Sequence, residues 1–173
     1  ASHYVEVEKD DEIREAILYA INNKLDILIL GGGSNMLFHN DFEGLVIKIN
    51  SKGVDVLSDD GRRLEVVVEA GEDWHEFVLK SLTNGWGGLE NLALIPGCVG
   101  ASPMQNIGAY GVEIKDVFSW LEAIEIKTCH LKRFNLKECK LDYRESVFKR
   151  ELKGEWVIVR VAYNLDRESP LKT

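Results

Sequence analysis

The chain has 173 residues, of which 45% are hydrophobic and 29% charged, a mixture typical of one folded domain or of two small lobes that bury a core. Its formal charge of −8 argues against nucleic acid or an anionic membrane as the main partner, because either would repel the protein. The apolar runs are shorter than the roughly 20 residues of a membrane span, and no export signal is visible, so we expect a cytoplasmic location.

The first fifty residues have the pattern of a β-α-β-β lobe. A weak alternation predicts a strand over 3–7, and Asp10 or Asp11 is expected to cap the helix that follows. Apolar runs predict strands over 27–30 and 45–49. The helix is expected to bury one stripe, formed by Ile13, Ile17, Ala20 and Ile21.

The next segment predicts a hairpin and a helix. Strands over 54–57 and 64–70 flank an Asp-Gly turn, the chemistry that tight hairpins favour. A helix is expected to begin after Asp73 and to end at Asn84-Gly85. Its inner face is formed by Trp74, Phe77, Val78 and Leu82.

The last third predicts more antiparallel sheet. Residues 121–127 and 131–135 read as a second hairpin, 136–139 as one helical turn, and 156–165 as a final strand. The order of elements predicts an α+β fold with mixed sheets and flanking helices.

We expect this fold to be divided into two lobes, residues 1–50 and 51–165. A polar tail over 166–173 is expected to be a linker. Ligand clefts often form where two lobes meet.

Three cysteines, an odd number without C-x-x-C spacing, predict free thiols rather than a disulfide framework or a zinc site: Cys98, Cys129 and Cys139. The four histidines are scattered and have no metal-binding spacing. The sequence therefore predicts no metal site.

Two glycine-rich loops carry the functional signal. The first, 31–35, directly follows an apolar run, and the second, 96–103, continues into 106–111. Glycines let a backbone come close to a ligand, and successive amides form a concave anion site. Together the loops predict a clamp around a diphosphate, although either loop alone could be a plain turn.

The common nucleotide fingerprints do not fit the first loop. Met36 stands where G-x-G-x-x-G requires its last glycine, and no Gly-Lys-Ser/Thr of a P-loop occurs. If a dinucleotide binds, loop amides must hold it without a helix behind the first loop.

Four motifs in order identify a family. LGGGSNMLF at 30–38, ENLALIPGCVGASP at 90–103, QNIGAYGVE at 105–113 and YRESVF at 143–148 together resemble bacterial UDP-N-acetylenolpyruvoylglucosamine reductases. The resemblance covers nearly the whole chain. It implies the two-lobed FAD-binding fold of the vanillyl-alcohol-oxidase (PCMH) type, and an enzyme that reduces a UDP-sugar enolpyruvyl ether with NADPH in peptidoglycan precursor synthesis.

The resemblance also implies roles for particular residues. Arg144 matches the active-site arginine of the family, where a guanidinium would stabilise negative charge on the substrate carboxylate. A surface ion pair with Asp142 or Glu145 is the alternative for this side chain. The residues implied in holding FAD, without a covalent bond, are Gly31, Gly32, Gly33, Ser34, Asn35, Met36, Leu37, Ile95, Gly97, Gly100, Ala101, Ser102, Met104, Ile107, Gly108, Ala109, Tyr110 and Gly111.

The chain departs from the family pattern at both ends. The family's substrate-binding domain, with its proton-donating serine and second carboxylate, would lie beyond residue 173, and the family's first segment is also missing. What remains is most of the FAD-binding site and one catalytic residue, so we expect no reductase turnover from the chain alone. We also expect a monomer without membrane or nucleic-acid partners.

Two other functions stay open. A flavin oxidase of the same fold would tether FAD covalently, and His39 or Cys98 would be the attachment residue. A cofactor-free interaction module would use the glycine loops only as turns.

Overall fold

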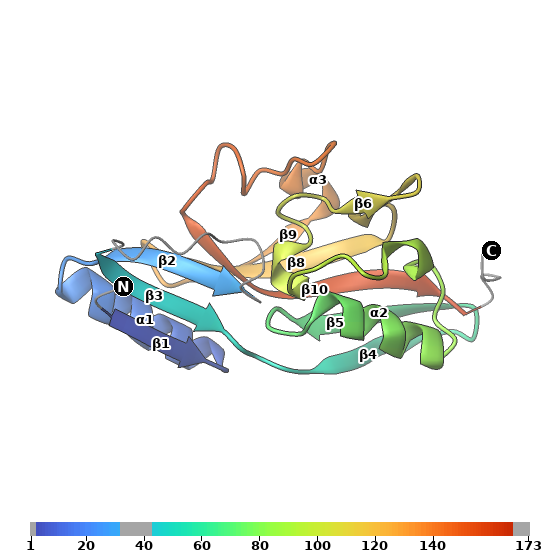
Figure 1. Ribbon diagram of the computed structural model, residues 1–173, viewed down its shortest axis with the longest axis horizontal. Helices are drawn as coiled ribbons and strands as arrows, with labels where there is room; N and C mark the ends of the chain where they lie inside the picture. Colours follow the sequence, from blue (N-terminus) through green and yellow to red (C-terminus); the bar gives the residue numbers. More distant parts are fainter. Residues whose placement is uncertain (1–2, 32–42, 168–173) are drawn as a thin grey trace.

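The strands form two main sheets that lie toward opposite ends of the molecule in a computed structural model, which describes residues 3–31 and 43–167 (Figure 1). Helix α1 (Asp10–Asn22) packs on the first sheet and helix α2 (Trp74–Thr83) on the second. This is the predicted α+β arrangement. No helix among the described residues is long and apolar enough to cross a membrane.

The first sheet contains three parallel strands in the order β1-β3-β2. These strands are β1 (His3–Val7), β2 (Asp26–Gly31) and β3 (Gly44–Ile49). All but one residue of the central strand β3 are buried, as expected for a parallel strand with neighbours on both edges.

Helix α1 begins at Asp10, so Asp10 is its first residue and not the cap that precedes it. Lys9 is the N-cap, and the Glu12 carboxylate accepts hydrogen bonds from the backbone N–H groups of Glu8 and Lys9, both 3.1 Å long. The prediction that Asp10 or Asp11 caps the helix was wrong. The prediction that Ile21 is buried was also wrong, because its side chain is 48% exposed.

The second sheet contains five antiparallel strands in the order β4-β5-β10-β8-β9. Its strands are β4 (Val54–Asp59), β5 (Arg63–Glu69), β8 (Phe118–Glu125), β9 (Leu131–Asn135) and β10 (Trp156–Asp166). Strand β8 begins three residues before its predicted start because Phe118 pairs with Tyr163 of β10.

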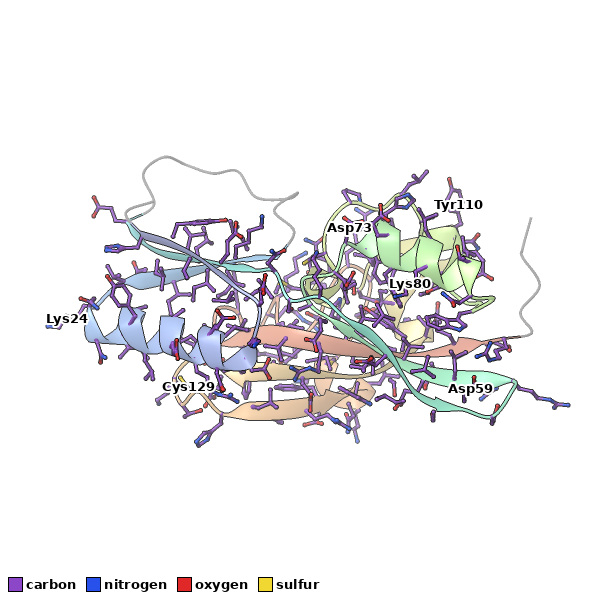
Figure 2. All side chains as sticks on the ribbon, turned by 90° about the horizontal axis from the view of Figure 1, so that it is seen from below. Lys24, Asp59, Asp73, Lys80, Tyr110 and Cys129 are labelled. Carbon is purple, nitrogen blue, oxygen red and sulfur yellow. The ribbon has the colours of Figure 1, made fainter. Side chains whose placement is uncertain are left out.

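Helix α2 has the predicted bounds and cap. The Asp73 side chain accepts a 2.9 Å hydrogen bond from the backbone N–H of Glu76, and Gly85 ends the helix with a φ of +72°. Figure 2 shows Asp73 at one end of the helix. Trp74 and Phe77 pack edge-on, at 5.8 Å between ring centroids, in the core below.

Strand β10 joins the two lobes by contributing to both cores. The pairing of β10 with β8 shifts between Ile158 and Arg160, and this bulge reverses the alternation of side chains. Val157 and Val159 therefore face the small core beneath α1, while Val161 faces the large core beneath α2.

Short elements connect α2 to β8 and β9 to β10. They are the 3₁₀ turns η1 (Glu90–Leu92), η2 (Val99–Ala101) and η3 (Ile114–Asp116), the small hairpin of β6 (Gly108–Ala109) and β7 (Val112–Glu113), and helix α3 (Leu136–Cys139). These connections carry most of the predicted site residues.

Candidate functional site

A cleft of about 200 Å³ lies where the two lobes meet. Five predicted site residues line it: Gly31, Gly97, Gly100, Ala101 and Met104. The remaining walls are mostly apolar and come from both lobes: Ile29, Ile49, Ala70, Cys98, Gln105, Trp156, Val157 and Ile158.

Gly31, at the end of β2, lies directly against the second glycine loop. A Cβ at Gly31 would stand only 2.5 Å from the Cys98 sulfur, which is closer than real Cβ contacts come. The first loop therefore begins inside the cleft. The other predicted residues of this loop lie outside the described residues: Gly32, Gly33, Ser34, Asn35, Met36 and Leu37.

The second glycine loop is fixed to the connection between β5 and α2. The Gly100 N–H donates to the Ala70 carbonyl at 2.9 Å, and a Cβ at Gly100 would lie 2.7 Å from the Ala70 Cβ. The Trp74 N–H donates to the Gly97 carbonyl at 3.0 Å. These bonds fix one side of the loop to the protein, and the loop lines the cleft with its other side.

Ser102 anchors the same loop in the core. Its hydroxyl donates to the Val99 carbonyl at 2.8 Å and lies 2.9 Å from the Tyr163 hydroxyl. Both side chains are buried, and burial raises the pKa of Tyr163. The Ser102 hydroxyl thus makes its hydrogen bonds within the protein.

Cys98 is a buried thiol on the cleft wall. It is 2% exposed, and burial raises its pKa, so the thiol stays protonated at neutral pH. The other residue considered for a covalent tether, His39, lies outside the described residues.

The predicted residues after the second loop form a tight hairpin. Tyr110 and Gly111 connect β6 to β7 with φ values of +53° and +78°, the two positive values that a type I′ turn requires. Tyr110 is 89% exposed and lies at the outer edge of the molecule (Figure 2). By contrast, Ile107, Ala109 and Ile95 pack against the large core.

Arg144 faces this hairpin rather than the cleft. It lies at the tip of a turn with a φ of +49°, and its guanidinium carbon is 5.3 Å from the centre of the Tyr143 ring. Together with Gly108–Gly111 it lines a pocket of about 300 Å³, the hairpin pocket. Within residues 3–31 and 43–167 no ion pair holds the Arg144 guanidinium, so its charge is available to an anionic ligand.

The cleft and the hairpin pocket are neighbours on either side of one short segment. Met104 and Gln105 line the cleft, and the next residue, Asn106, lines the hairpin pocket. The cleft is smaller than the roughly 300–1,000 Å³ typical of a ligand site, and the hairpin pocket is at the lower end of that range. The two cavities thus adjoin along the segment that follows the second glycine loop.

The sequence did not reveal every residue of the site. Val157 and Ile158, at the start of β10, also line the cleft, and no sequence signal for this was recognised. Asn106 was missed as well, although its place before a glycine motif suits a left-handed residue. Among the described residues, no group of three His, Cys, Asp or Glu side chains could hold a metal ion.

Comparisons with known proteins show the family of the chain. The profile of the family described as FAD binding domain matches residues 1–133. A UDP-N-acetylenolpyruvoylglucosamine reductase of Pseudomonas fluorescens (strain Pf0-1) is 50% identical over 171 residues, which are 99% of this chain and 50% of the relative. The reductase of Amoebophilus asiaticus is 43% identical over 173 residues, 51% of its length. The chain thus spans about half the length of these relatives.

Solved structures show the same fold. The UDP-N-acetylenolpyruvylglucosamine reductase of Thermus caldophilus aligns with a TM-score of 0.71 at 22% identity, over 94% of this chain and 55% of that chain. A solvent-stable cholesterol oxidase aligns with a TM-score of 0.69 at 14% identity, over 95% of this chain and 34% of that chain. The predicted two-lobed flavoprotein fold of the PCMH type is confirmed.

Proposed function

Because the chain belongs to the FAD binding domain family, we propose that it holds FAD non-covalently between its lobes, as the flavin-binding half of a UDP-N-acetylenolpyruvoylglucosamine reductase. One observation carries the proposal: Gly31 of the first lobe meets Cys98 of the second glycine loop in one cleft. Two glycine-rich loops from different lobes therefore converge where the backbone can come close to a dinucleotide diphosphate.

The proposed cofactor contacts divide between the two cavities. The first loop, from Gly31 to Leu37, would hold the diphosphate with backbone amides, and Met104 would cover the cleft. The second loop, from Gly97 to Ser102, would instead line the diphosphate by close approach of its backbone, because the N–H groups of Gly100, Ala101 and Ser102 already donate within the protein. The segment from Ile107 to Gly111 would contact the flavin ring from the hairpin side. Ile95 would support the second loop from the core.

Arg144 is the proposed catalytic residue of this half. When bound, FAD would supply hydride transfer from NADPH to the enolpyruvyl ether of a UDP-sugar. The Arg144 guanidinium, exposed in the hairpin pocket, would bind the substrate carboxylate and stabilise the negative charge that develops on it. Its backbone adopts the left-handed region, with a φ of +49°.

The partners follow from the same proposal. The relatives' name gives a UDP-sugar enolpyruvate as the substrate that they reduce. For the intact protein we propose NADPH as the reductant, peptidoglycan precursor synthesis as the pathway and the cytoplasm as the location. The charge of −8 makes nucleic acid and anionic membranes poor partners. We expect the chain to be a monomer.

Thermal unfolding with added FAD tests the proposal. A ligand at a hundred times its dissociation constant stabilises a protein by about 2.7 kcal/mol, so the melting temperature should rise with FAD and the purified protein should be yellow. A colourless protein whose melting temperature does not change when FAD is added would instead support the cofactor-free interaction module.

Acid precipitation separates the two flavoprotein functions. Flavin that leaves the precipitated protein supports non-covalent binding, whereas flavin that stays in the pellet would support the tethered oxidase. The protonated, buried thiol of Cys98 favours the first outcome because a thiolate is the reactive form.

A further inference from the structure

Asn106 is the most connected polar side chain between the two cavities. It is 1% exposed and has a φ of +44°. Its Oδ1 accepts from the backbone N–H of Lys115 at 2.9 Å, and its Nδ2 donates both to the Asp142 carbonyl at 2.9 Å and to the Glu113 carboxylate. The side chain therefore joins three segments.

The Asp142 bond matters because Asp142 begins the turn that carries Arg144. Asp142 and Glu145 exchange two backbone hydrogen bonds of 3.0 Å, which leave Tyr143 and Arg144 at the tip. A turn closed in this way moves as a unit, so a bond to the Asp142 carbonyl restrains Arg144.

A second bond ties the other side of the turn to the same segment. The Ser146 hydroxyl, fully buried, donates to the Met104 carbonyl at 2.6 Å. Residues 104–106 thus hold the turn at both of its ends, and these are the residues that separate the cleft from the hairpin pocket.

We propose that Asn106 is a positioning residue, which fixes the Arg144 turn to the glycine-rich segment that would hold the flavin. This inference rests on the proposed function and deepens it. Asn106 borders the hairpin pocket, but its side chain is only 1% exposed and both its Oδ1 and its Nδ2 are bonded within the protein. It acts through Asp142, by keeping the guanidinium at a constant place relative to the cofactor segment.

The test variant is Asn106→Gly. Glycine adopts a positive φ without strain, so this change removes the amide while keeping the backbone. The matched control is Asn84→Gly, which removes an asparagine that also donates to a backbone carbonyl, Lys80 at 2.7 Å, at the far end of α2. Ser146→Ala removes the second tie.

The first readout is trypsin cleavage of the Arg144–Glu145 bond, followed by mass spectrometry in the 173-residue chain below its melting temperature. We expect Asn106→Gly and Ser146→Ala to raise the cleavage rate at least tenfold, and Asn84→Gly to leave it unchanged. An unchanged cleavage rate in Asn106→Gly, or an equal rise in all three variants, would contradict the claim that Asn106 restrains the turn. This readout needs neither flavin nor activity.

The second readout separates positioning from general stability in the complete gene product. Asn106→Gly should lower kcat for UDP-sugar-dependent NADPH oxidation about tenfold, equivalent to about 1.4 kcal/mol, with the KM for NADPH and the affinity for FAD unchanged. A matching loss of FAD affinity, or an unchanged kcat, would overturn the positioning role. If the unaltered protein binds no FAD, the proposed function and its catalytic extension fail, while the cleavage readout still decides whether Asn106 holds the turn.

Discussion

Arg160 of β10 binds Asp10 at the start of α1, with Nη2 2.8 Å from both carboxylate oxygens. The same guanidinium contacts Glu122 at 2.9 Å and Glu69 at 3.3 Å, on the two strands that flank β10. Its side chain is only 18% exposed. Arg160 therefore links the first lobe to three strands of the second, on the far side of the bulge from the cleft wall.

Arg160→Met should destabilise the protein by about 2–3 kcal/mol because it leaves three partly buried carboxylates without their shared cation. Urea unfolding at pH 7 measures this difference. The difference should shrink in acid, because burial raises the pKa of the Glu69 carboxyl and its protonated form needs no cation. Lys140→Gln, which breaks an exposed pair with Glu151, is the control and should cost less than about 1 kcal/mol. Equal losses in the two variants would contradict the linking role of Arg160.

Because the Cys139 thiol is buried, we predict that the free energy of unfolding falls at alkaline pH. Burial is the main cause that raises the pKa of its thiol to about 12, from the ordinary value of 9.0. A raised pKa means that the stabilisation is fully present below pH 9 and is lost as the pH rises toward 12. Cys139→Ala removes this ionisation, so its difference from the unaltered protein should shrink over that interval by up to about 1.4 kcal/mol per pH unit. Guanidinium unfolding at several pH values measures it, and a constant difference would contradict the prediction.

Tyr163→Phe should cost about 1 kcal/mol, since it removes the hydroxyl that Ser102 contacts while keeping the buried ring. Thermal unfolding measures this loss. Tyr4→Phe removes a hydroxyl that is bonded to Glu6 at an exposed site, and it should change stability by less than about 0.5 kcal/mol. The account of Ser102 as an anchor of the second loop would be wrong if the two variants behaved alike.

Much of the fold could be predicted where local signals and tertiary packing agree. Asp73 and the pair Asn84-Gly85 define α2 because each satisfies backbone groups at a helix end. The Asp-Gly turn defines the hairpin of β4 and β5 in the same way, with Asp60 accepting from the N–H groups of Arg62 and Arg63.

The sequence predictions fail where a contact between residues far apart in the chain determines the local structure. Asp10 has the right chemistry for a cap, but its carboxylate binds Arg160, 150 residues away in the chain. The bulge of β10 exchanges the faces of the strand, so that Val157 and Val161 lie in different cores, and it depends on pairing with β8. Asn106 owes its importance to Asp142, which no local pattern places beside it.

The most direct measurement of the central claim is a calorimetric titration of FAD into the unaltered chain, Gly31→Ala, and Gly31→Ala combined with Cys98→Ala. The added Cβ would crowd the Cys98 sulfur at 2.5 Å, and the second change removes that sulfur. We predict that the unaltered chain binds FAD, that Gly31→Ala weakens binding at least tenfold, and that the double variant recovers most of the affinity. Equal FAD binding by the unaltered chain and Gly31→Ala, or no binding by any of the three, would contradict the claim that FAD lies where Gly31 meets the second loop.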